Sequence, residues 1–121
     1  MRTVAQALGF DAERVVAQQL RREGWTILGR NVRVGRAEID ILAVDEAAGT
    51  VVAVEVRWRG RRDYGLPEET VSRAKLARLR SALLTLRHGE PGSLPVPRLP
   101  VRLDIVAIEP GGRVRHHRGV T

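Results

Sequence analysis

The 121-residue chain contains no cysteine and very few aromatic residues. Without cysteine it can form neither disulfides nor thiolate metal sites, so carboxylates and three histidines remain as the candidate metal ligands. Aromatic residues make up only 3% of the sequence, so the core must be built from Val, Leu, Ile and Ala. Apolar residues nevertheless account for 43% of the chain, which suits a packed domain and argues against disorder.

Long apolar segments are also missing. No run approaches the roughly 20 consecutive apolar residues that a membrane-spanning helix needs, and the N-terminal residues lack the apolar core of a secretory signal. We therefore expect a cytoplasmic protein without a membrane partner. Its length fits one domain over residues 1–121.

Acidic residues are outnumbered, with 14 Asp and Glu against 21 Lys and Arg and a formal net charge of +7. A domain this basic usually binds phosphate, and nucleic acid is the commonest polyphosphate in the cytoplasm. Lys75 is the only lysine, as a GC-rich coding bias would produce. That bias explains why arginine replaces lysine, but it does not explain the excess of positive charge. The charge therefore predicts a nucleic-acid partner.

Hydrophobic periodicity predicts the order α-β-β-β-α-β, with a short final strand left open. Helices are expected over 4–23 and from Pro67 to about His88, because Pro and acids suit a first turn. Strands are expected over 25–33, 36–44, 51–59, 101–108 and near 113–118. This order predicts an α/β fold in which two helices flank one mixed sheet.

The two middle strands form a predicted hairpin with acidic residues on one face. In the first of them, one face is expected to hold Ala37, Ile39, Ile41 and Ala43, and the other Glu38, Asp40, Leu42 and Val44. In the second, the corresponding sets are Val52, Val54, Val56 and Trp58, expected in the core, and Val51, Ala53, Glu55, Arg57 and Arg59. If Val44 faces Val51, Asp40 lies opposite Glu55.

Two carboxylates side by side on a sheet repel each other unless a cation or a proton neutralises them. Asp40 and Glu55 would suit Mg²⁺, which prefers carboxylate oxygens and keeps open water positions. An ion there could polarise a phosphodiester and activate water. In the alternative reading both acids are solvated strand residues, and a register slip of two would separate them. The pattern alone leaves both readings open.

Two further acids are ambiguous. Glu13 lies at the edge of the apolar stripe of the first helix, where it is either a third site carboxylate or an ordinary surface residue. Asp104 lies between Leu103 and Ile105 in the strand over 101–108. A buried acid needs partners, so pairing with Arg98 or Arg102 is favoured over a metal role.

Basic residues follow Glu55 directly. Four arginines fall within six residues, at Arg57, Arg59, Arg61 and Arg62, and such a cluster favours an anion that collects them. Arginines also recur every seven residues along the second helix, but a solvated helix face would look the same.

Six segments in order resemble the YraN family of bacterial proteins, which are similar to archaeal Holliday junction resolvases and restriction endonucleases. They are GFDAE at 9–13, GWTILGRN at 24–31, AEIDILA at 37–43, VEVRWR at 54–59, GLPEETV at 65–71 and RLDIVAI at 102–108, with Lys75 between the last two. The resemblance covers roughly residues 5–109. It implies a restriction-endonuclease-like fold and leaves a homodimer open.

The resemblance also implies a nuclease site made of an acid, a second acid and Glu-x-Lys. Carried over, Glu13, Asp40 and Glu55 would hold Mg²⁺ or Mn²⁺, and Arg57 stands where lysine is expected. Arginine stays charged and mainly clamps phosphate, whereas lysine can lose its proton. Lys75 is then a candidate to supply an amine from the second helix, or to bind nucleic acid together with the arginine cluster.

Three functions remain open at this point. The first is a metal-dependent nuclease that acts on branched or structured DNA, as in repair or recombination. The second is a non-catalytic nucleic-acid-binding protein that keeps the nuclease fold, which the arginine at position 57 favours. The third is a structural or partner-binding module whose basicity reflects coding bias alone.

Overall fold

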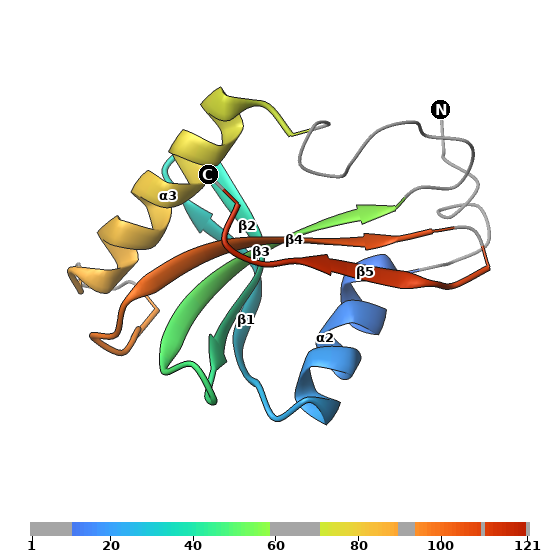
Figure 1. The fold of residues 1–121 in the computed structure, drawn as a ribbon. Coiled ribbons are helices and arrows are strands. Elements are labelled where there is room, and N and C mark those ends of the chain that lie inside the picture. Colours follow the sequence, from blue (N-terminus) through green and yellow to red (C-terminus); the bar gives the residue numbers. More distant parts are fainter. Residues whose placement is uncertain (1–10, 59–70, 90–93, 110, 121) are drawn as a thin grey trace.

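A computed structural model describes residues 11–58, 71–89, 94–109 and 111–120 (Figure 1). Its elements in order are α2 (Ala12–Arg22), β1 (Thr26–Val34), β2 (Ala37–Asp45), β3 (Thr50–Trp58), α3 (Arg73–Arg87), β4 (Val101–Ile108) and β5 (Val114–His117). The five strands form one sheet in the order β1-β2-β3-β4-β5. Strands β3 and β4 are parallel, and the other neighbouring pairs are antiparallel. The predicted α/β fold, with one mixed sheet and two flanking helices, is confirmed.

The helices cover opposite faces of the sheet, and each helix has its own apolar cluster. On one face α3 packs through Leu76, Leu79, Leu83 and Leu86 against Leu42, Val51, Leu103 and Ile105. On the other face α2 packs through Val16, Ala17 and Leu20 against Trp25, Ile41, Val52, Val54 and Val106. Aliphatic side chains dominate both clusters, as the composition predicts. A strand with both faces covered is buried throughout, which explains the continuous apolar runs in β2 and β3.

The first helix differs from its prediction at the N-terminal end. An uninterrupted helix over 4–23 is wrong, because Asp11 is extended, with φ of −111° and ψ of 95°. Its carboxylate accepts a hydrogen bond from the Arg14 backbone N–H at 3.0 Å, which caps the helix that follows. Residues 4–10 lie outside the described residues. The helix ends near Gly24 as predicted, and Gly24 adopts a φ of +88°.

The second helix starts later than predicted. A start at Pro67 is wrong for the described residues, because 71 and 72 are not helical and the helix begins at Arg73. The Ser72 side chain accepts a hydrogen bond from the Lys75 backbone N–H at 3.1 Å and is the N-cap. The capping signal of this serine outweighs that of Pro67. The predicted end near His88 is confirmed.

Of the registers that the sequence leaves open for the central hairpin, the structure has the one in which Val44 faces Val51. Val44 pairs with Val51, and the ladder runs from Asp45 and Thr50 to Ile41 and Val54. The connecting turn contains Gly49 at a φ of +58°, a conformation that a residue with a Cβ atom rarely adopts.

Side-chain alternation in β2 differs from the prediction. Ile39 and Ala37 were expected on the face of Ile41, but they pack in the α3 cluster with Leu42. Strand β1, which pairs with this part of β2, changes the faces of its side chains in the same place, because Asn31 has a φ of +51°. The two strands therefore change faces together, and Asp40 lies at the change in β2. A period-2 reading cannot detect this, because it assumes extended backbone throughout.

The end of β3 is more open than predicted. Trp58 was expected in the core, but it is 36% exposed. Val56, two residues earlier on the same face, is already only half-buried. The apolar row thus continues beyond the part of the sheet that α2 covers.

Among the described residues no helix is both long and apolar enough to cross a bilayer.

Candidate functional site

The candidate site lies where β2 and β3 separate. Their ladder ends at Ile41 and Val54, one pair before Asp40 and Glu55 would face each other. Beyond that point the Val56 backbone N–H donates to Asp40 Oδ2 at 2.9 Å. A side-chain oxygen thus replaces a main-chain acceptor of β2 and holds the Asp40 carboxylate in the gap between the strands.

Asp40 is poorly stabilised as an anion. Burial, together with the negative charges of Glu55 and Glu13, raises its pKa to about 7. The hydrogen bond from Val56 and the charge of Lys75 act in the opposite direction but are too weak to offset this. Near neutral pH the carboxylate therefore competes for a proton or another cation.

Glu55 is more deeply buried, with 5% of the residue exposed. Its Oε1 accepts a hydrogen bond from Lys75 Nζ at 2.6 Å and lies 3.9 Å from Arg57 Nη1. Its Oε2 is also buried but has no hydrogen-bond partner. Buried carboxylate oxygens are rarely left in this state, because desolvation without a partner is costly. One oxygen of Glu55 is therefore available to a ligand.

Lys75 reaches the site from the first turn of α3. Ser72 caps that helix through the Lys75 backbone N–H, so the capping residue also sets where the lysine side chain begins. The sequence motif assigns the lysine position to Arg57, yet Lys75 makes the much shorter contact with Glu55. Lys75, the single lysine of the chain, thus makes the close contact with Glu55 that the motif would assign to residue 57.

Glu13 approaches the site from α2. Burial raises the pKa of Glu13, while the charge of Arg30 and a hydrogen bond from Asn31 lower it. The Arg30 guanidinium lies 3.7 Å from Glu13 and makes two shorter bonds to Asp11, at 3.0 and 2.8 Å. Because Glu13 contributes to the raised pKa of Asp40, its charge acts on the site, but no bond joins the two carboxylates.

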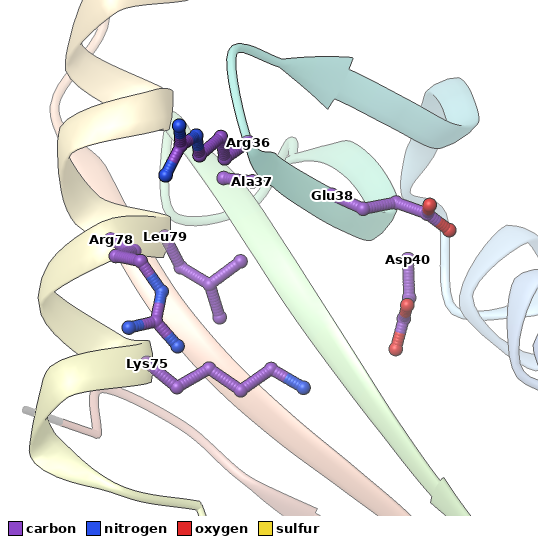
Figure 2. A pocket seen from close by; sticks show the side chains of 7 residues that line it. All are labelled: Arg36, Ala37, Glu38, Asp40, Lys75, Arg78 and Leu79. Carbon is purple, nitrogen blue, oxygen red and sulfur yellow. The ribbon is translucent and has the colours of Figure 1, made fainter.

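A cavity of about 280 Å³ adjoins Asp40. Figure 2 shows its lining: Arg36, Ala37, Glu38, Asp40, Lys75, Arg78 and Leu79. The basic side chains come from α3 and the β1–β2 turn, and the acidic ones from β2. The cavity thus has one cationic and one anionic wall.

The remaining predicted site residues are distributed as follows. Arg57 is half-buried beside Glu55, with 35% of its side chain exposed. Arg59, Arg61 and Arg62 lie outside the described residues. Among residues 11–58, 71–89, 94–109 and 111–120, no three His, Asp or Glu side chains are grouped closely enough to hold a metal ion together.

A second polar cluster, which we call the Asp104 network, consists of Asp45, Arg102, Asp104 and His116. Arg102 bonds both oxygens of Asp104, at 2.8 and 3.0 Å, and one oxygen of Asp45 at 2.9 Å. His116 Nε2 lies 2.7 Å from Asp104, and the Gly119 backbone N–H donates to Asp104 at 3.0 Å. The predicted pairing of Asp104 with Arg102 is confirmed.

Sequence reasoning missed two features. His116 reads as a surface residue, but its side chain is only 16% exposed. Its position in the C-terminal segment, three residues before Gly119, gives no signal that its side chain contacts β4. Arg36 and Arg78 were not singled out as lining a cavity, because nothing in the sequence brings the β1–β2 turn beside α3.

Comparison with known proteins identifies the family. Residues 12–108 match the model of "Uncharacterised protein family UPF0102". A UPF0102 protein of Symbiobacterium thermophilum is 40% identical over 117 residues, covering 93% of this chain and 92% of the relative. Relatives from Clavibacter michiganensis and Paenarthrobacter aurescens are 41% identical over 108 residues and 39% identical over 119, covering 88% and 93% of this chain and 85% and 92% of their own. The chain belongs to this bacterial family, UPF0102 or YraN, as its sequence motifs predict.

Proposed function

We propose that the protein is a metal-dependent nuclease that hydrolyses phosphodiester bonds in branched or otherwise structured DNA. The observation that carries the proposal is the combination at Glu55 of one oxygen held by Lys75 and a second, buried oxygen with no hydrogen-bond partner. The net charge of +7 supports a polyphosphate substrate. The preference for branched DNA comes from the resemblance to junction resolvases.

The residues fit a divalent cation such as Mg²⁺ or Mn²⁺. Glu55 Oε2 is a buried hard donor without a partner, and the pKa of Asp40, about 7, means that its anion lacks stabilisation. Mg²⁺ is commonly held by one or two carboxylates together with water and substrate phosphates. Asp40 and Glu55 would hold the ion, and Glu13 would add negative charge from α2. A bound ion would supply Lewis acidity toward a phosphodiester and lower the pKa of an attacking water.

The protein's own residues have separate tasks in this proposal. Glu55 and Lys75 position each other through their 2.6 Å contact. The Lys75 ammonium would bind a non-bridging oxygen of the reacting phosphate and stabilise charge that develops there. Arg57, with its guanidinium 3.9 Å from Glu55, would clamp phosphate, since it cannot act as a base. Arg59, Arg61 and Arg62 follow it in sequence and would extend the contact with the DNA backbone.

A second function is favoured by a specific observation. Among the described residues no three-ligand metal group is present, and an arginine stands at the motif's lysine position. A nucleic-acid-binding protein without hydrolytic activity would show both features. It would still bind phosphate through the same basic residues, and its binding would depend steeply on salt.

A cleavage assay separates these two functions. Four-way junctions, flaps and single strands are incubated with Mn²⁺ or Mg²⁺ and with wild type, Asp40→Asn or Glu38→Gln. The nuclease predicts metal-dependent products that Asp40→Asn reduces by about a thousandfold, a loss typical of a main electrostatic group. Glu38→Gln is the matched control, because Glu38 lines the same cavity but pairs with Arg33 at 3.4 Å. Wild-type products no more abundant than those of Asp40→Asn, with DNA binding intact, would leave only the binding function.

A further inference from the structure

The cavity beside Asp40 contains two arginines that the nuclease proposal does not use. Arg36 lies in the two-residue β1–β2 turn, after Gly35 with a φ of +59°. Arg78 lies one helical turn after Lys75 on α3. Both are exposed, and within the described part of the chain neither has an ion-pair or hydrogen-bond partner. Two cations that share a cavity with two carboxylates would ordinarily pair with them, so their separation needs an explanation.

The separation follows from where the side chains lie. Figure 2 shows Lys75 and Arg78 on the α3 wall with Arg36 at the upper end of the cavity. On the β2 side Glu38 extends away from α3, and Asp40 points toward the lower end, where the Lys75 side chain extends. Glu38 is already paired with Arg33 outside the turn. The cavity therefore presents a row of cations, Lys75, Arg78 and Arg36, that starts at the candidate site.

A second groove adjoins the cavity at Arg36 and Arg78. Beyond Arg36 and Arg78 a shallow, largely apolar groove of about 520 Å³ runs between the β1–β2 turn and α3. Small side chains such as Ala77 and Ala82 form much of its surface, and Thr85 lies at its far end. A surface that is cationic at one end and apolar at the other matches the two parts of a nucleotide, a phosphate and a sugar with its base.

We infer that Arg78 and Arg36 form a backbone track for one unpaired DNA strand, holding the phosphates next to the one that lies at Asp40, Glu55 and Lys75. The inference rests on the proposed function for the position of the reacting phosphate and deepens it by naming the substrate's strandedness. Successive cations on the track bind successive phosphates, and the sugar and base pack on the small residues of the adjoining groove. Selection then falls on structured DNA that has unpaired segments, such as flaps.

The opposite wall of the cavity disfavours a duplex. A single strand can lie with its phosphates toward Arg78 and Arg36 and away from Glu38. A duplex that entered the same space would bring its second strand against the β2 wall, whose cavity-lining residues Glu38 and Asp40 offer its phosphates no cation. The cavity of about 280 Å³ is also small, at the lower limit of small-molecule sites.

Binding in EDTA tests the track without any need for hydrolysis. Fluorescence anisotropy would compare a single-stranded 12-mer and its duplex across a series of salt concentrations. The test variant is Arg36→Gln with Arg78→Gln. The control is Arg73→Gln with Arg80→Gln, which removes the same charge from exposed α3 positions that line a different hollow. We expect wild type to prefer the single strand and the test variant to bind it at least tenfold more weakly. Its salt slope should fall by about 1.4, because each single-strand phosphate contact contributes about 0.7.

A second arm locates the contacts. Single methylphosphonate substitutions remove one phosphate charge at a time from the 12-mer. Wild type should lose affinity at positions to which the Arg36→Gln/Arg78→Gln variant is indifferent, and the control should behave as wild type does. Equal weakening by the test and control pairs, or duplex binding as tight as single-strand binding, would overturn the track. Failure of metal-dependent cleavage with these binding results intact would instead refute only the nuclease.

Discussion

Two acidic clusters in one sheet differ in how fully hydrogen bonds and cations stabilise their carboxylates. In the Asp104 network, burial raises the pKa of Asp104, but bonds from His116, Arg102 and Gly119 outweigh it and hold the pKa below its usual value. In what we call the Asp40 site, made of Asp40, Glu55 and Lys75, burial and the charges of nearby acids together raise the pKa of Asp40 to about 7. Glu55 Oε2 has no hydrogen-bond partner.

The difference distinguishes a structural from a functional use of buried charge. Asp104 and Asp45 share Arg102, whose guanidinium also lies 5.6 Å from the centre of the Trp25 ring. Every strong acceptor of Asp104 is used within the fold, so the network has no capacity left for a ligand. In the Asp40 site, by contrast, Glu55 Oε2 has no hydrogen-bond partner and the Asp40 anion is poorly stabilised. Neither feature stabilises the fold, so this unused capacity to bind a cation is not explained by folding alone. An under-stabilised, buried acid pair is typical of a functional site.

The largest expected effect is a loss of stability when the Asp104 network is disrupted. Asp104→Ala leaves the half-buried side chains of Arg102 and His116 without their main acceptor, so we expect the free energy of unfolding to fall by about 3–5 kcal/mol. Urea denaturation at pH 7 measures it. Glu55→Gln, the matched change in the Asp40 site, should cost less than about 1 kcal/mol because it removes a repulsion with Asp40. Equal losses from the two variants would erase the distinction between the clusters.

A catalytic effect should follow at Lys75. Lys75→Met removes the cation 2.6 Å from Glu55 while keeping much of the side-chain volume, and we expect cleavage to slow by about a hundredfold, as when one charge-stabilising donor is lost. Arg57→Lys should leave the rate within about twofold, because Lys75 already supplies an amine. Single-turnover assays provide both rates. A rate that rises with Arg57→Lys and ignores Lys75→Met would return the lysine role to position 57.

The two clusters should also respond to pH with opposite sign. The pKa of Asp40 is about 7 in the folded protein and 3.8 as its ordinary value, so the folded state binds the extra proton and stability falls as pH rises from about 4 to 7. Asp40→Asn should therefore be more stable than wild type at pH 8, by about 2 kcal/mol once solvent screening of the half-buried carboxylate is allowed for, and equal to it near pH 4. For Asp104, whose pKa is lowered, stability is instead lost as pH falls through its folded pKa. Denaturation curves at several pH values test both signs. A stabilisation by Asp40→Asn that is the same at pH 4 and pH 8 would contradict the ionic origin.

Much of the sheet was predictable because it depends on local rules. Paired apolar rows restricted β2 and β3 to a set of registers that includes Val44 opposite Val51, the one the structure adopts, and an acid buried between apolar neighbours required a partner such as Arg102. Both follow from period-2 geometry and from the cost of burying charge.

The rest depended on backbone and tertiary details that alternation cannot encode. The positive φ of Asn31 accompanies the change of faces beside Asp40, and Ser72 rather than Pro67 begins α3. The contact between Lys75 and Glu55 joins residues 20 apart through that helix start. The cavity arginines come from a turn and a helix that only the fold brings together.

Calorimetric titration with Mn²⁺ at pH 8 tests most directly whether the unused capacity of the Asp40 site is a cation site. We predict that wild type and Glu38→Gln bind one ion per chain with similar affinity, and that Asp40→Asn and Glu55→Gln each weaken binding at least tenfold. No detectable binding to wild type, or unchanged binding by Asp40→Asn and Glu55→Gln, would contradict the account.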